Sequence, residues 1–252
     1  MLPEEQELAR LEAEQAQLQD QLASAELILK TIETETAIFQ RRYYRTVGHL
    51  YAELDSLDAD LARLRLRQNP ADTAIREEAR AAEQRAKKSA EEVGLFKAKH
   101  EPPPTISASV KEAYRRAVKL LHPDLATNER ERQRRTELMA LVNLAYERGD
   151  QATIEKLMKD FRQDPDAVTG DDIGARLVKT IRRNAQLRQR LNEVQEEIEA
   201  EKRSGIFVLR QRVEGAEAKG GDPLGDLAKQ LIQQIAERKS KLRAEAAKSA
   251  TG

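Results

Sequence analysis

The sequence predicts an all-α protein in which antiparallel coiled coils or helical hairpins flank a small helical domain. Ala, Glu, Lys, Leu, Arg and Gln dominate its 252 residues, a composition typical of long helices. Charged side chains make up 35% of the chain and aromatic side chains only 4%, so we do not expect one large compact core. We divide the chain into a long helix with a coiled-coil hairpin (1–99), a proline linker with a small helical domain and an added helix (100–164), and further coiled-coil helices (165–252).

A sustained heptad pattern predicts the first long helix. Its seam alternates steps of three and four residues through Leu8, Leu11, Gln15, Leu18, Leu22, Ala25, Leu29, Ile32, Thr36 and Phe39. Two successive steps of four then lead to Tyr43 and Val47, a stutter that should locally unwind the supercoil. The seam resumes from Leu50 to Leu64, so we expect a helix that extends to Gln68 and needs a partner.

A second helix should fold back on the first. Asn69 and Pro70 end the long helix, and Pro70 suits the first turn of the next one. The segment Ala71–Lys99 carries small seam residues, which predict close antiparallel packing on roughly residues 40–66: Ile75, Ala79, Ala82, Ala86, Ser89, Val93 and Phe96. The alternative is a single solvated helix. The residues His100–Pro104 then predict a stiff polyproline connector.

The C-terminal part of the chain shows the same kind of seam after a break from Pro165 to Gly174. Its members are Leu177, Thr180, Asn184, Leu187, Leu191, Val194 and Ile198. A kink at Ser204-Gly205, a turn at residues 220–223 and a last helix from Leu224 predict another helical hairpin. This part either covers residues 4–39 of the first helix, or residues 8–39 pair with a second copy in a homodimer.

The central segment, residues 110–124, predicts an amphipathic helix that ends in a His-Pro-Asp turn. A capping box of Ser109 and Glu112 should start it, and Pro123 should end it at His122. Four residues make a narrow apolar face: Val110, Ala113, Ala117 and Leu121. Four basic residues cover the rest: Lys111, Arg115, Arg116 and Lys119. We expect the turn to be exposed and to present an imidazole and a carboxylate.

These residues resemble the J-domain, the module with which DnaJ-type co-chaperones stimulate a DnaK-class ATPase. The resemblance covers roughly residues 105–148 and rests on Tyr114-Arg115-Arg116, on His122-Pro123-Asp124, and on Asn143, Ala145 and Tyr146. There are three departures: no Tyr-x-x-Leu-Gly first helix, Leu125 in place of a basic residue, and Gly149 in place of a leucine. Auxilin-like J-domains also replace the first helix with a longer one.

The resemblance implies a binding site for the chaperone. His122, Pro123 and Asp124 would contact it and promote ATP hydrolysis, with Tyr114 as part of the same motif. The basic residues Lys111, Arg115, Arg116 and Lys119 would meet an acidic surface and chiefly raise the association rate. After the turn, we expect a solvated loop and helix start over residues 126–135. We then expect a third helix packed through Met139, Val142, Ala145 and Tyr146, and an added helix with an apolar face of Ile154, Leu157, Met158 and Phe161.

Other classes of function lack support in the sequence. The 44 basic and 44 acidic residues balance, whereas nucleic-acid binders normally carry a basic excess. The absence of cysteine excludes disulfides and a cysteine-based zinc module. His49 and His100 lack a second metal ligand at a suitable spacing, and no phosphate-binding loop or catalytic arrangement is present. We therefore expect no enzyme, no metal and no cofactor.

The sequence thus predicts a J-domain co-chaperone that recruits an unidentified client through its coiled-coil arms. The alternative is a coiled-coil scaffold with a J-like fold that no longer engages the chaperone. An acidic N-terminus and the lack of a long apolar run predict a cytoplasmic protein without a membrane partner.

Overall fold

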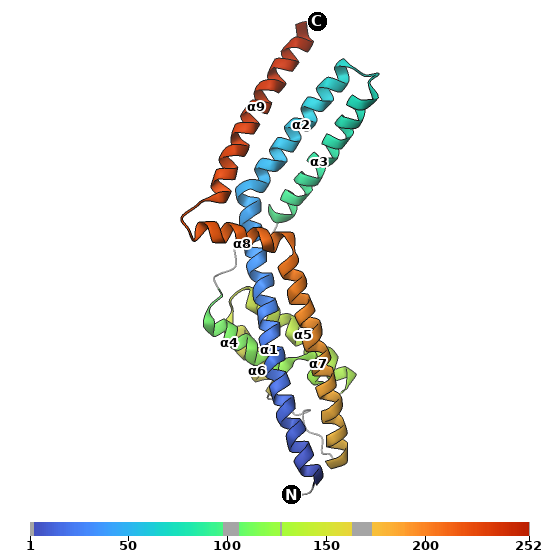
Figure 1. Cartoon of the computed structure of the whole chain (residues 1–252), viewed down its shortest axis with the longest axis vertical. Coiled ribbons are helices and arrows are strands. Elements are labelled where there is room, and N and C mark those ends of the chain that lie inside the picture. Colours follow the sequence, from blue (N-terminus) through green and yellow to red (C-terminus); the bar gives the residue numbers. More distant parts are fainter. Residues whose placement is uncertain (1–2, 98–105, 127, 163–172, 252) are drawn as a thin grey trace. The chain divides into compact units, whose positions relative to one another are not determined.

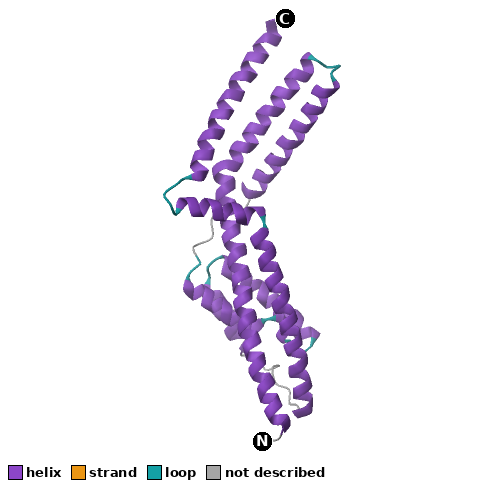
Figure 2. Cartoon of the chain, in the orientation of Figure 1, coloured by secondary structure: helices purple, strands orange, loops and turns teal. Residues whose placement is uncertain are grey.

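The computed structural model describes residues 3–97, 106–126, 128–162 and 173–251 (Figures 1 and 2). All regular elements in these ranges are helices, which confirms the predicted all-α class. The chain forms two compact units: Met1–Glu35 with Pro103–Phe207, and Thr36–Pro102 with Val208–Gly252. Each unit therefore combines segments from distant parts of the sequence, whereas our division ran through three successive segments.

The first unit contains a long pair of helices, α1 (Pro3–Tyr43) and α7 (Ile173–Arg203). The seam predicted in each helix is buried against the other, in an apolar cluster that includes Leu18, Leu22, Leu29, Leu187 and Val194. The sequence left two arrangements open, and one of them, the packing of the C-terminal part on the first helix, is therefore present within a single chain. The other, a homodimer through residues 8–39, stays a prediction that light scattering can test.

The two helices of this pair run parallel. Arg176 of α7 pairs with Glu12 of α1, and Arg190, further along α7, pairs with Glu26, further along α1. The chain must return to the other end of α1 before a parallel α7 can begin, and the small helical domain belongs to this connection. The expected hairpin within the C-terminal part is wrong, because α7 packs on α1 and the last helix packs on a different partner.

The small helical domain of the first unit consists of α4 (Ala108–Leu121), the short 3₁₀ helix η2 (Pro123–Leu125), α5 (Glu129–Glu147) and α6 (Gln151–Arg162). The predicted apolar faces meet in its core: Val110, Ala113, Ala117, Leu121, Met139, Val142, Ala145, Tyr146, Ile154 and Met158. Ala23 of α1 belongs to the same core, with Leu27 packed against it. A stretch of α1 therefore completes this domain.

The start of α4 differs from the sequence prediction. Ser107 is the N-cap, and its hydroxyl accepts a hydrogen bond from the Val110 amide at 3.3 Å. Ser109 lies inside the first turn, where its hydroxyl is 2.9 Å from that of Ser107. The capping box of Ser109 and Glu112 is wrong, because the helix begins before Ser109 and the preceding serine takes the capping position.

In the second unit, α2 (His49–Gln68) and α3 (Thr73–Lys97) form the predicted antiparallel hairpin. The small seam residues Ala79 and Ala82 are buried with Ala59 and Ala62 of α2. The helix α3 starts later than expected. Asp72 accepts a hydrogen bond from the Ala74 amide at 2.8 Å, which leaves Pro70 in the connecting turn.

The last helix, α9 (Pro223–Thr251), is the second partner of α2. Arg238 pairs with Asp58 at 2.6 Å, and the apolar residues Leu231 and Ile235 pack with Val47 and Leu50. The predicted stutter falls on a π-helical turn, η1 (Tyr44–Gly48), between α1 and α2. A π turn is wider than an α turn, so the predicted local disturbance is confirmed.

The predicted kink is also confirmed, because α7 ends at Arg203 and α8 (Gly205–Glu217) starts two residues later. Gly220 has a φ of 85° and makes the turn into α9, as the sequence predicts. The connector His100–Pro104, most of the break from Pro165 to Gly174 and the side chain of Phe96 lie outside the described residues. Within the described ranges, no helix combines the length and the apolar character needed to cross a bilayer.

Candidate functional site

The His-Pro-Asp turn connects α4 to α5 inside the first unit. The backbone of α4 ends at Leu121, as the proline predicts, and Pro123 opens the short helix η2. Arg135 of α5 reaches back to this end: its Nη1 donates to the carbonyl oxygens of Leu120 at 2.9 Å and of His122 at 3.4 Å. A guanidinium at a helix C-terminus satisfies carbonyl groups that have no partner within the helix. Arg135 therefore holds the turn in place.

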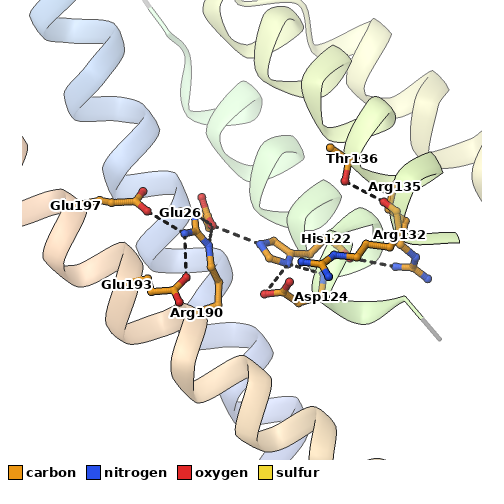
Figure 3. A network of polar contacts seen from close by, with 9 residues as sticks. All are labelled: Glu26, His122, Asp124, Arg132, Arg135, Thr136, Arg190, Glu193 and Glu197. Carbon is orange, nitrogen blue, oxygen red and sulfur yellow. Dashed lines mark hydrogen bonds and ion pairs between the residues drawn. The ribbon is translucent and has the colours of Figure 1, made fainter. Parts of the chain in front are cut away.

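His122 is buried, with only 7% of its surface exposed. Its Nδ1 accepts the backbone N–H of Asp124 at 3.2 Å, which assigns the ring proton to Nε2. Nε2 lies 3.4 Å from Oε1 of Glu26 on α1 and donates to it (Figure 3). The carboxylate of Asp124 lies 3.7 Å from Nδ1. The predicted exposed turn is therefore wrong for the imidazole, while Pro123 and Asp124 are partly exposed.

Glu26 joins three helices at this point. Arg190 of α7 donates to the same carboxylate at 3.0 Å, and its Nη1 lies 2.9 Å from Oε1 of Glu197 (Figure 3). Burial by itself would raise the pKa of Glu26, but the hydrogen bond from His122 and the charge of Arg190 outweigh it and hold the pKa below its usual value. The carboxylate is therefore ionised in the folded protein at neutral pH.

Leu125, the residue after the tripeptide, is buried in the apolar cluster of α1 and α7 with 8% of its surface exposed. Arg183 of α7 donates to its carbonyl oxygen at 2.7 Å. A basic side chain at this position would have to enter an apolar cluster, at a high cost in desolvation. The departure from the J-domain pattern at Leu125 therefore has a structural counterpart in the packing of the turn on α1 and α7.

The basic face of α4 is largely ion-paired. Arg115 and Lys119 both meet Asp20 of α1, and Arg116 lies 3.2 Å from Glu155 of α6. The hydrogen bond from Lys119 lowers the pKa of Asp20. Lys111, near the start of the helix, is partly exposed. These pairs are at the surface, where each contributes little to stability, but they take up the charges that were expected to face a partner.

Tyr114 belongs to the core of the domain. Its ring lies 4.7 Å from that of Tyr146, and its hydroxyl donates to Oδ1 of Asn143 at 2.8 Å. The Tyr146 hydroxyl is 2.8 Å from that of Thr31 on α1. Burial raises the pKa of Tyr114. Tyr114 was assigned to chaperone binding together with the rest of its motif. In the structure its side chain packs α4 against α5 and is not placed to contact a partner.

A cleft of about 790 Å³ opens beside the turn. It is lined by His122 and Asp124, by Arg132 and Asn143 of α5, and by Arg190 of α7. These groups can donate and accept hydrogen bonds. Within the described ranges, no three His, Asp or Glu side chains are grouped in a way that could hold a metal ion.

Three residues that hold the turn were not singled out from the sequence: Glu26, Arg183 and Arg190. Arg135 was expected in a solvated loop and helix start over residues 126–135, which is wrong for this side chain, because only 9% of its surface is exposed. For Glu26 and Arg190 a signal existed. Glu26 follows a d position of the first seam, and Arg190 precedes an a position of the last one, so they occupy the e and g positions at which charges pair across parallel coiled coils. For Arg135 there was none, because one arginine in a run of charged residues cannot be told from the others.

Comparisons of the chain with protein-family models, with curated proteins and with solved structures found no match.

Proposed function

We propose that this chain is a J-domain co-chaperone of a DnaK-class ATPase. The observation that carries the proposal is the His-Pro-Asp turn between α4, with its basic face, and α5. Tyr114 and Asn143, both part of the resemblance, hydrogen-bond to each other across these helices. The long helix α1 packs on this domain through Ala23 and Leu27, which fits a J-domain whose first helix is replaced by a longer one.

In this proposal the turn and the basic helix act in different ways. Pro123 and Asp124 contact the chaperone together with His122 and promote ATP hydrolysis. Lys111, Arg115, Arg116 and Lys119 meet an acidic surface and raise the rate of encounter, which should fall as the ionic strength rises. No residue of this chain performs bond chemistry, so the co-chaperone is not itself an enzyme and uses no cofactor.

The coiled-coil surfaces are the proposed place of client recruitment. Large apolar side chains are about half exposed on two of these helices, Val178 and Ile181 on α7 and Ile232 on α9. Exposed apolar positions on a helix suit helix-on-helix or helix-in-groove contacts. We infer a dedicated client of that kind in the cytoplasm, and neither nucleic acid nor a membrane as partner.

The burial of His122 favours a second candidate, a helical scaffold whose J-like domain no longer engages a chaperone. In that case the pair of Glu26 and His122 would serve stability alone. The two functions differ in one measurable property, the effect of the full chain on the ATPase of a DnaK-class chaperone.

The test is a single-turnover ATPase assay with a DnaK-class chaperone. We expect the full chain to accelerate hydrolysis, and His122→Gln or Asp124→Asn to abolish the acceleration while circular dichroism shows unchanged helicity. Stimulation of equal size by the variants and the wild type would contradict the J-domain function. The absence of any stimulation at saturating chaperone, with a known J-domain active in the same assay, would favour the scaffold.

A further inference from the structure

The residues of the His-Pro-Asp turn face elements of their own chain. Three kinds of contact attach the turn and the basic helix to α1 and α7. His122 is hydrogen-bonded to Glu26, Leu125 is buried in the cluster of the two long helices, and Arg115 and Lys119 pair with Asp20. We propose that α1 and α7 form an autoinhibitory clamp, which must release the turn before a chaperone can bind. This inference depends on the proposed co-chaperone function.

The charges of the clamp explain why α1 and a chaperone would compete for the turn and the basic helix. The helix α1 offers two carboxylates, Asp20 and Glu26, to the groups that an acidic partner surface would meet. An acidic chaperone and α1 cannot occupy these groups at the same time. Because α1 belongs to the same chain, its effective concentration is high, so the closed state is favoured until a competing interaction offsets it.

The clamp is not anchored by a fully apolar seam. Asn184 occupies a core position of α7 with 1% of its surface exposed. Its amide nitrogen donates to the Leu11 carbonyl oxygen at 3.0 Å, but its Oδ1 accepts no hydrogen bond within the described part of the chain. A buried acceptor without a donor weakens the pairing of α1 and α7. The pairing that closes the clamp is therefore weaker than a fully apolar seam would make it.

Two substitutions should open the clamp from different sides. Glu26→Lys places a positive charge beside Arg190 and His122, and Leu125→Lys puts a charge into the apolar cluster. Glu12→Lys is the matched control. Glu12 also follows a d position of α1 and pairs with a g-position arginine of α7, Arg176, at 2.7 Å, but it has no contact with the turn. Each full-length variant is first checked for helicity by circular dichroism.

The first readout is exposure of the imidazole. Diethyl pyrocarbonate acylates accessible imidazoles, and mass spectrometry compares His122 with His49, which is exposed in the same chain. We expect both opening variants to raise the acylation rate of His122 relative to His49 by about tenfold, in proportion to the population of the open state. The control should stay near the wild type. Equal rates in all four proteins would overturn the clamp.

The second readout is the chaperone concentration needed for half-maximal ATPase stimulation. We expect this concentration to fall about tenfold in both opening variants and not in Glu12→Lys. The reason is that the apparent affinity for the chaperone is reduced in proportion to the fraction of molecules in the open state. Adding His122→Gln to an opening variant should remove the stimulation. If wild type and opened variants stimulate equally and all depend on His122, the clamp is overturned and the co-chaperone function stands. If none stimulates although His122 becomes reactive, the co-chaperone function fails, and the proposed regulation fails with it.

Discussion

The two long helix pairs, α2 with α3 and α1 with α7, show how different a seam can be within one chain. The first pair meets through Ala59, Ala62, Ala79 and Ala82, all at most 5% exposed. The second buries Leu22 and Leu187, but also Asn184 and Thr180. Small apolar residues permit close and permanent packing, whereas polar core positions cost stability and favour a defined partner. The difference teaches that the α2–α3 pair is closed by small apolar side chains alone, while the α1–α7 pair includes polar core positions that lower its stability and specify its partner.

The largest expected effect comes from a substitution that disrupts the alanine seam between α2 and α3. Ala79→Leu adds a side chain where 3% of the residue is exposed, and overpacking should cost about 1–3 kcal/mol of unfolding free energy. The exposed neighbour Ala81, changed to leucine, should differ from wild type by less than about 0.5 kcal/mol. Urea unfolding followed by circular dichroism measures both, and hydrogen exchange should place the loss in α2 and α3. If Ala79→Leu leaves the unfolding free energy unchanged, this hairpin is not more closely packed than the α1–α7 pair.

A smaller effect of opposite sign should come from the polar seam. Asn184→Leu replaces a buried amide by an apolar side chain and should raise the unfolding free energy by about 1 kcal/mol, because no unpaired acceptor remains. Asn192→Leu on the exposed side of the same helix is the control. We also expect His122 to react more slowly with diethyl pyrocarbonate in Asn184→Leu.

Light scattering should accompany this measurement, because an asparagine at a core position can also set the number of helices. A mass that doubles only in Asn184→Leu would assign it that role. A doubled mass in the wild type would instead favour the homodimer through residues 8–39. Destabilisation by Asn184→Leu would contradict a seam that is weakened by its buried amide.

The smallest effect concerns acid. The folded-state pKa of Glu26 is held below its unfolded value, so its contribution to stability is complete above the unfolded pKa of about 4.3 and is lost as the pH falls through the folded pKa. From pH 6 down to pH 3, the unfolding free energy of Glu26→Gln should therefore fall less than that of wild type. Parallel curves for Glu26→Gln and the wild type would remove Glu26 from the pH response.

Local patterns were sufficient for most of the helical structure. Most members of the seams from Leu8 to Phe39 and from Thr180 to Ile198 are buried as predicted, since a heptad repeat needs only the neighbouring turns to be recognised. Gln15 and Leu191 are only partly buried. The stop at His122, the hairpin of α2 with α3 and the break after Arg203 have the same local origin. The predicted cap of α4 was two residues late, because Ser107 and Ser109 are equally good capping residues by type and the sequence does not choose between them.

The sequence by itself determined where helices form and which faces must be covered. The tertiary structure decided what covers them. A seam specifies a partner face but neither its identity nor its direction. The sequence therefore left the partner of residues 8–39 open between the C-terminal part and a second copy, and it indicated neither the parallel direction of α7 on α1 nor the packing of α9 on α2. The state of the His-Pro-Asp turn was decided in the same way. His122 and Glu26 are far apart in the sequence, and only folding brings that carboxylate, together with Arg190, onto the imidazole. Exposure is a property of the surroundings, so the imidazole of a turn that is polar in sequence is buried in the structure, while Pro123 and Asp124 stay partly exposed.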